Sequence, residues 1–304
     1  YKDTTSPRSS YHLMRLPCIF PTFAFQVRLM LQRGITGFFF ILVMVGGIYG
    51  GRYTFVGLFA VITAGCLWEY LSLVLDRGRK RDLIRKMLGV LLGLTPFAGN
   101  SLMHLGLVAD EALFVSGSLL VFFPLLFMAF IYEMYAQSEH PFTNVGYAVL
   151  GMVYIGVPFA MLEFIAFDGK QFYAGAVMGL LILTWGNDTA AYVFGSRWGR
   201  RPLSPRLSPK KTWEGALGGG VFTLAVGWIL SLFITSLSPL NWIMLALIVA
   251  VFGTFGDLVE SMLKRSFEVK DSGRLLPGHG GLLDRFDGFI FLIPFAAAYI
   301  LLLR

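Results

Sequence analysis

Cysteine and histidine are scarce in this 304-residue chain, which has two cysteines and four histidines. Cys18 and Cys66 are too few for a disulfide framework, and Cys66 lies within an apolar run. Without a cluster of His and Cys ligands, a zinc site is not expected. The pattern Gly-x-x-x-x-Gly-Lys-Ser/Thr does not occur either, which excludes a Walker-type nucleotide site.

Charged residues are also scarce: they make up 14% of the chain, apolar residues make up 56%, and the mean hydropathy is +0.69. Several apolar runs reach the roughly 20 residues that a helix needs to cross a bilayer. These values exclude an ordinary soluble domain and predict a multi-pass membrane protein. The excess of 25 Lys and Arg over 18 Asp and Glu fits loops that face anionic membrane lipid and phosphates, so no nucleic acid partner is expected.

The predicted fold is all-α, a polytopic transmembrane helical bundle with about nine spans and a polar cavity facing the cytoplasm. Loops rich in Lys and Arg follow the second, sixth and eighth spans, so one topology places them all on the cytoplasmic side of an inner membrane. The candidate spans are 34–50, 53–75, 87–108, 112–132, 146–166, 172–194, 216–236, 240–262 and 288–303. The only Lys and Arg residues left on the opposite side are Arg52, Lys170 and Arg304.

The first 29 residues differ from the rest. They lack a starting Met, and the apolar run Leu16–Phe25 is too short and too interrupted by proline for a signal peptide. Met30 is a natural start before the first span. We therefore expect residues 1–29 to be a disordered arm or a misplaced start, and residues 30–304 to form the membrane domain.

Polar residues cluster where the eighth span meets the cytoplasm. Asp257, Glu260, Ser261 and Lys264 recur at three- and four-residue spacing and so share one helix face. A carboxylate at this depth is costly unless it is paired, bound or hydrated, which favours a functional role. An interfacial ion pair between Glu260 and Lys264 is the simpler alternative.

Two further carboxylates, Asp284 and Asp287, open the last span. They could cap its helix, where the macrodipole favours negative charge. Beside Asp257 they would instead form an oxygen-rich site for Mg²⁺, which takes one or two carboxylates and accepts substrate phosphates.

The segment before them holds Lys270, Asp271 and a glycine-rich turn that contains His279, Gly280 and Gly281. Glycines let backbone N–H groups approach anionic oxygens closely. This turn is therefore a candidate phosphate contact, with His279 either packing in the turn or touching the ligand.

A second group of polar residues runs from the sixth span into the loop that follows it. Asn187 and Asp188 interrupt an apolar helix and either line a hydrated cavity or form a hydrogen bond between helices. Lys210 and Lys211 form either a phosphate clamp or a plain cytoplasmic anchor. Glu69 and Glu163 also lie in apolar stretches, and the sequence alone assigns them no role.

These motifs resemble the signature of the phosphatidate cytidylyltransferase family, the CDP-diacylglycerol synthases. The signature lies at 261–287, and Ser208–Gly215 and Asp188–Tyr192 resemble a second family region. The matching signature positions are Ser261, Lys264, Arg265, Lys270, Asp271, Gly273, Leu276, Pro277, His279, Gly280, Gly281, Asp284, Arg285 and Asp287.

The resemblance implies transfer of a cytidylyl group from CTP to phosphatidate, giving CDP-diacylglycerol and pyrophosphate. It also implies Mg²⁺, a monovalent cation such as K⁺, and a homodimer. Carried over by position, Asp257 and Asp284 are the implied metal ligands. The other implied catalytic residues are Ser261, Lys264 and Asp287. The implied substrate-binding residues are Asp188, Lys210, Lys211, Arg265, Lys270, Asp271, His279, Gly280, Gly281 and Arg285.

Three alternatives are weighed against this reading. A related transferase could use another lipid acceptor, such as a polyprenol phosphate. A transporter or channel could use Asp188, Asp257 and Asp284 to bind a translocated cation. A scaffold without catalysis is the third. The last two leave the Lys-Asp and His-Gly-Gly positions of the signature unexplained.

Overall fold

The computed structural model describes residues 23–75, 81–108, 111–169, 171–273 and 280–304. Helices account for most of these residues, together with two short antiparallel hairpins. The all-α prediction is therefore confirmed for the described part of the chain. The described residues start at Phe23, where the first helix begins, so most of the predicted N-terminal arm lies outside them.

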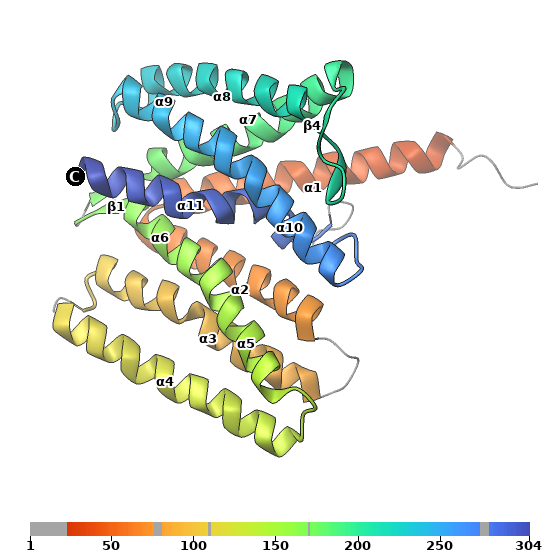
Figure 1. The fold of residues 1–304 in the computed structure, drawn as a ribbon. Helices are drawn as coiled ribbons and strands as arrows, with labels where there is room; N and C mark the ends of the chain where they lie inside the picture. The colour runs from red at the N-terminus through yellow and green to blue at the C-terminus, as the bar shows by residue number, and fades with distance from the viewer. Residues whose placement is uncertain (1–22, 76–80, 109–110, 170, 274–279) are drawn as a thin grey trace, which may run out of the picture.

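Long helical segments occur in the described residues at each predicted span position (Figure 1). Two segments are made of an α-helix, a π-helical turn and a second α-helix. They are α5 (Pro141–Gly151), η1 (Met152–Gly156) and α6 (Val157–Ala166), and α9 (Pro239–Ile248), η2 (Val249–Gly253) and α10 (Thr254–Ser266). The others are α1 (Phe23–Tyr49), α2 (Arg52–Leu75), α3 (Arg81–His104), α4 (Glu111–Ala136), α7 (Ala174–Trp198), α8 (Trp213–Phe233) and α11 (Leu283–Leu303).

Six helical segments among the described residues are long and apolar enough to cross a membrane. A seventh stretch, Gly34–Tyr49 of α1, is apolar but shorter. This composition fits a polytopic membrane protein. The six are Arg52–Leu75, Ser116–Ala136, Pro141–Ala166, Trp213–Phe233, Pro239–Ser266 and Leu283–Leu303.

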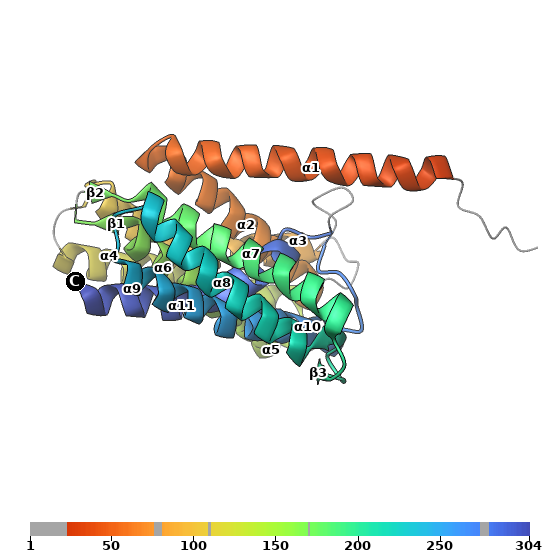
Figure 2. The same ribbon diagram turned by 90° about the horizontal axis from the view of Figure 1, so that it is seen from above.

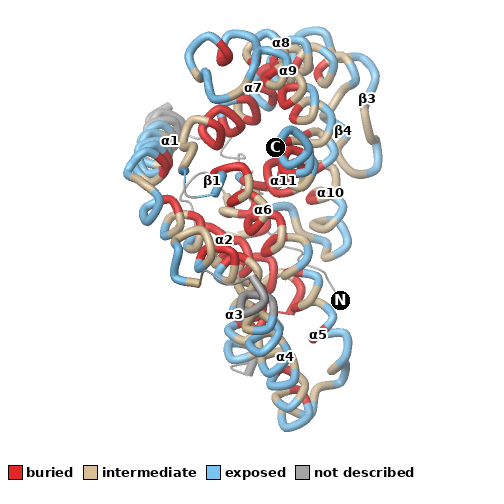
Figure 3. The backbone as a smooth tube through the Cα atoms, turned by 90° about the vertical axis from the view of Figure 1, so that its left-hand side faces the viewer, coloured by how far each residue is buried: buried red, intermediate tan, exposed pale blue. Residues whose placement is uncertain are grey.

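The helices form two groups with α10 and α11 between them (Figure 1). Helices α7, α8 and α9 pack together on one side, and α2 to α6 pack together on the other. Helix α1 runs along one edge of the bundle beside α2 and α7 (Figure 2). The most buried residues lie where α2, α6, α7 and α11 meet, whereas residues 34–49 of α1 and 116–136 of α4 are largely exposed at the periphery (Figure 3).

A close contact between glycines sets the distance between α10 and α11. A Cβ atom on Gly256 would lie 2.7 Å from the Cα of Gly288, which leaves no room for a side chain. Small residues allow such close backbone approach between membrane helices. This contact brings the polar end of α10 against the first turns of α11.

Three structural features differ from the sequence-based expectation. Residues expected in a cytoplasmic loop instead form a hairpin of β3 (Pro202–Ser204) and β4 (Ser208–Thr212). A second small hairpin pairs β1 (Phe167–Asp168) with β2 (Gln171–Phe172). Helix α11 begins at Leu283, ahead of the predicted span start at 288. Hydropathy detects only the apolar part of a helix, so the polar first turn of α11 escaped it.

Candidate functional site

The polar end of α10 faces α11, and Lys264 connects the two helices. Its Nζ lies 2.9 Å from Oδ1 of Asp284 and also pairs with Glu260, one turn earlier on α10. Glu260 is almost fully buried, at 1% exposure, so a nearby cation is needed to offset its charge. The ion pair offered as the simpler alternative is therefore present, but it extends to a signature carboxylate on α11.

Asp284 organises the chain that precedes α11. Its carboxylate accepts hydrogen bonds from the backbone N–H of Gly281, at 2.8 Å, and of Ser272, at 3.2 Å. The N-cap residue of α11, Leu282, makes no side-chain cap hydrogen bond, whereas Asp284 lies in the first turn of the helix, where the macrodipole favours a carboxylate. The helix-cap alternative for Asp284 and Asp287 therefore stays open. Asp287 accepts a hydrogen bond from the adjacent Gly288 N–H.

Lys210 and Lys211 are neighbours on strand β4, and their side chains point in different directions. Successive side chains of a strand point to opposite faces. Accordingly, Lys211 forms an ion pair with Asp257 of α10, while Lys210 lines a neighbouring cavity. The base of the hairpin is held by Glu214, whose Oε2 accepts hydrogen bonds from the backbone N–H of Arg200 and Arg201 at 3.0 and 3.1 Å.

A cavity of about 270 Å³ lies between the hairpin and α10. Four cationic side chains line it together with one carboxylate, so its net charge is positive. Such a cavity suits a polyphosphate, whose oxygens need several cationic partners. Its lining residues are Leu207, Ser208, Pro209, Lys210, Ser261, Lys264, Arg265, Lys270 and Asp271.

A second cavity, of about 320 Å³, opens between α1, α7 and the start of α11. One wall is apolar, formed by Phe40, Ile41 and Trp185, and the other end is charged. This combination suits an amphiphile with an ionic head. The charged or polar members are Thr36, Asp188, Thr189, Asp284, Arg285 and Asp287.

Asp257 lies between the residues of these cavities. A Cβ atom on Gly288 would approach its Oδ1 to 3.0 Å, and its charge interacts with those of Asp188 and Asp287. The neighbouring Asn187 instead accepts a hydrogen bond from the Thr223 hydroxyl at 3.1 Å. Asn187 therefore joins α7 to α8, as one of the two alternatives predicted, whereas Asp188 faces a cavity.

The donor chemistry of the site fits Mg²⁺. The carboxylates of Asp257 and Asp284 would supply hard oxygen ligands, which Mg²⁺ prefers. Across the described residues, no three carboxylate, imidazole or thiol groups form a ready-made metal cage. Mg²⁺ needs only one or two protein carboxylates when phosphates complete its shell, so Asp257 and Asp284 remain the predicted ligands.

The predicted site residues that the structure describes gather at one end of the molecule. His279 lies outside the described residues. Gly280 has a φ of +85°, and a Cβ atom there would meet Oδ2 of Asp284 at 3.1 Å, which explains the glycine.

Sequence reasoning missed Glu69 of α2, which accepts a hydrogen bond from the Leu283 N–H at 2.8 Å. A carboxylate within an apolar helix was the available signal.

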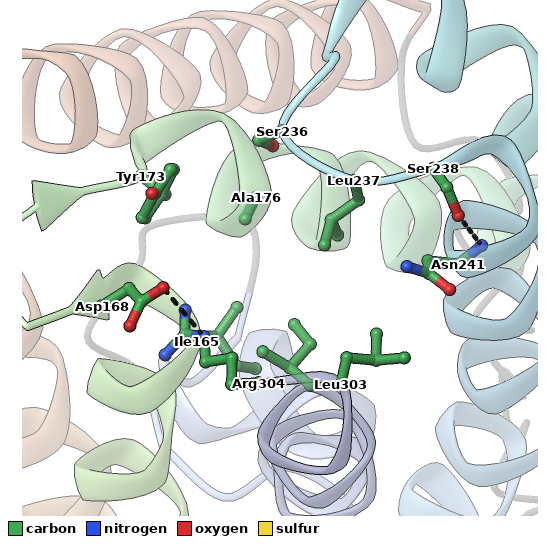
Figure 4. Close-up of a pocket in the computed structure, with 11 residues that line it drawn as sticks. Ile165, Asp168, Tyr173, Ala176, Ser236, Leu237, Ser238, Asn241, Leu303 and Arg304 are labelled. Atoms are coloured by element: carbon green, nitrogen blue, oxygen red, sulfur yellow. Dashed lines mark hydrogen bonds and ion pairs between the residues drawn. The ribbon is translucent and has the colours of Figure 1, made fainter.

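A third cavity, of about 240 Å³, lies at the opposite end and contains none of the signature residues (Figure 4). Arg304 enters it and approaches Asp168 to 3.6 Å. Its guanidinium also donates to the backbone carbonyls of Phe164 and Phe167, at 2.8 and 2.6 Å. These contacts connect the end of α11 to the β1 region.

The fold and site define a polytopic membrane protein with a charged, phosphate-suited site where α7, the β3–β4 hairpin, α10 and α11 meet. A sequence profile described as the Cytidylyltransferase family matches residues 31–303, and the chain belongs to this family. Among similar proteins is the phosphatidate cytidylyltransferase of Staphylococcus haemolyticus, 39% identical over 175 residues, or 56% of this chain and 65% of the relative. That of Bacillus subtilis is 42% identical over 168 residues, or 54% of this chain and 61% of the relative. The matched part thus spans less than two thirds of these relatives.

Proposed function

We propose that this protein transfers the cytidylyl group of CTP to phosphatidate, giving CDP-diacylglycerol and pyrophosphate for phospholipid biosynthesis. The observation that carries the proposal is a pair of cavities joined by one ion pair: Lys264 lines the first cavity, Asp284 lines the second, and the two side chains contact each other. One is cationic and suits a triphosphate. The other combines an apolar wall with a charged end and suits a lipid phosphate. Family membership and the names of the two relatives point to the same reaction.

In the proposed reaction, a phosphate oxygen of phosphatidate attacks the α-phosphorus of CTP. A new P–O bond forms as the α–β bridging P–O bond breaks, and pyrophosphate leaves with the electron pair. The attacking oxygen is already anionic, so no strong general base is required. Catalysis then depends on positioning and on neutralising charge.

The residues of the chain have distinct parts in this scheme. Lys210, Lys264, Arg265 and Lys270 offset the charge of the triphosphate in the cationic cavity, where Ser261 adds a hydroxyl donor. Arg285 lies at the charged end of the amphiphilic cavity and is placed to meet the phosphatidate phosphate.

Lys211 orients Asp257, and Lys264 with two backbone N–H groups orients Asp284. Mg²⁺ held by these two carboxylates would neutralise charge on the triphosphate and the leaving pyrophosphate. A monovalent cation such as K⁺ is proposed as a further cofactor.

We propose that the nine helical segments seen in the described residues all cross the inner membrane, with the site on the cytoplasmic side. The distribution of Lys and Arg supports this orientation, because the β3–β4 hairpin and the end of α10 lie at the same end of the molecule (Figure 1). CTP would then enter from the cytosol, while the acyl chains of phosphatidate stay in the bilayer. We also propose a homodimer.

The deciding experiment supplies the purified protein in detergent with phosphatidate, radiolabelled CTP and Mg²⁺. The expected result is a labelled, lipid-soluble product together with pyrophosphate. A parallel reaction with a polyprenol phosphate tests the related-transferase alternative and should give no labelled lipid. If the folded protein labels neither acceptor, the proposed reaction is excluded. If it labels only the polyprenol phosphate, the lipid acceptor is a polyprenol phosphate and not phosphatidate.

A further inference from the structure

Glu69 lies far from the signature in sequence, yet it contacts the signature segment directly. It is buried, at 3% exposure, on the face of α2 that also carries Gly65. A Cβ atom on Gly65 would meet the Leu282 side chain at 2.6 Å, so α2 passes close beneath the start of α11. One turn further along α2, Oε2 of Glu69 accepts the hydrogen bond from the Leu283 N–H.

The same carboxylate also fits against two glycines on either side of residues 274–279. A Cβ atom on Gly273 would overlap Oε1 of Glu69, and one on Gly281 would come within 2.6 Å of Oε2. The backbone therefore lies directly on the carboxylate at both positions. Only glycine leaves room for this contact.

Asp284 holds the same two stretches from another side. Its carboxylate accepts from Ser272 N–H and Gly281 N–H, one from each stretch. Two carboxylates thus contact the described residues 272–273 and 281–283: Glu69 from α2, and Asp284 from α11. Because Asp284 also pairs with Lys264, displacement of these flanking residues would disturb a site carboxylate as well.

We infer that Glu69 is a positioning residue for the active site, which it reaches through the backbone at 272–273 and 281–283. It lines neither of the two site cavities, so it acts on the reaction through Asp284 and the signature segment. The inference rests on the proposed function because one of its two tests measures cytidylyl transfer; the other test does not.

The test compares Glu69→Ala and Glu69→Gln with the same changes at Glu163. Glu163 is an equally buried carboxylate, but on α6, where it accepts a hydrogen bond from Ser101. Because a misplacement of about 1 Å can reduce turnover about 100-fold, Glu69→Ala should lower kcat by about that factor, with a smaller change in the KM for CTP. Glu69→Gln keeps the volume and an acceptor oxygen, so its kcat should lie between those of Glu69→Ala and the wild type. The Glu163 variants should keep wild-type turnover.

Hydrogen exchange provides a readout that does not depend on turnover. In Glu69→Ala, amide protection should fall at 281–283 and stay unchanged in α4 and α8, whereas Glu163→Ala should leave 281–283 protected. Wild-type protection and turnover in both Glu69 variants would overturn the inference. If the wild-type protein itself showed no cytidylyl transfer, the proposed function would fail, while the exchange result would still decide the positioning role.

The single variant Gly273→Ala keeps the inference testable if Glu69→Ala folds poorly, and the double variant adds a test of direct contact if it folds. Gly273→Ala alone should lower both turnover and the protection at 281–283, because its new methyl group meets Glu69. Combined with Glu69→Ala, it should add little further loss, since the carboxylate it would meet is gone. Fully additive losses would contradict direct contact and overturn the inference.

Discussion

Lysine side chains hold both of the predicted metal-ligating carboxylates in this structure. Lys211 pairs with Asp257, and Lys264 pairs with Asp284. Each pair is partly buried, so its charges are screened less than those of surface ion pairs. The ammonium groups therefore fix the positions of oxygens that the reaction is proposed to use.

Replacing Asp284 with Asn removes the negative charge and keeps the shape of the side chain. The amide oxygen can still accept a hydrogen bond from Gly281 N–H, so the fold should be retained. Turnover should fall at least about 100-fold, since the proposed Mg²⁺ loses one of its two carboxylate ligands and Lys264 loses a charged partner. Radiolabelled CTP transfer and thermal unfolding measure the two effects separately.

Asp168→Asn is the matched control, because Asp168 pairs with Arg304 at the opposite end of the molecule. It should leave turnover unchanged. If Asp284→Asn kept most of its activity, Asp284 would serve only to hold the backbone of Ser272 and Gly281, and not as a ligand in the reaction.

Sequence reasoning could predict the site residues that are near one another along the chain. Asp257 and Lys264 share one face of a helix, and Asp284 opens the next helix after one short segment, so their convergence was predictable. Glu69 was not, because its contact with Leu283 joins residues 214 positions apart. No local pattern encodes which buried carboxylate of α2 meets which later backbone, and only the packing of α2 beneath α11 reveals it.

The β3–β4 hairpin gives adjacent lysines different partners. The segment carries Pro, Lys and Ser without alternation of apolar and polar residues, so its strand character was not predictable. In a loop, Lys210 and Lys211 could have reached the same phosphate. In a strand, they point to opposite sides, one toward the cationic cavity and one toward Asp257.

Alanine variants of these two lysines should therefore affect different kinetic constants. Lys210→Ala should raise the KM for CTP by about 10-fold, the effect of one lost charge-assisted contact, and leave kcat nearly unchanged. Lys211→Ala should mainly lower kcat, because Asp257 loses its partner. Steady-state kinetics with varied CTP distinguish the two, and Arg206→Ala, at an exposed position of the hairpin, serves as control. Identical effects of both lysines would contradict the strand geometry.

The contact between α10 and α11 is the second element-level feature with a direct test. Gly256→Ala adds a methyl group where only 2.7 Å separates its carbon from Gly288, and overpacking of this kind costs about 1–3 kcal/mol. The helices should separate slightly, so thermal stability and turnover should both fall. Gly253→Ala is the control, because its Cβ atom would meet the Leu292 side chain at an ordinary 3.7 Å. Equal stability of the two variants would show that α10 and α11 tolerate separation.

At the scale of the whole molecule, the C-terminal end of α11, which carries Arg304, lies opposite the end that holds β4 and the end of α10 (Figure 1). The proposed topology places the first outside and the second in the cytoplasm. Single cysteines at the exposed positions Arg206 and Ser236, in a background with Cys18 and Cys66 replaced, report the two ends. In intact cells, a membrane-impermeant maleimide should label Ser236→Cys at once and Arg206→Cys only after permeabilisation. The reverse pattern would invert the proposed orientation.

The fit of Glu69 against Gly273 and Gly281 also has an evolutionary consequence. A side chain at either glycine requires a smaller residue at position 69, and loss of the carboxylate leaves the Leu283 N–H without its acceptor. Glu69, Gly273 and Gly281 are therefore expected to change together, because most single changes among them are unfavourable. Descendants of this sequence should keep all three residues together or exchange them jointly, even where the surrounding apolar residues of α2 drift freely.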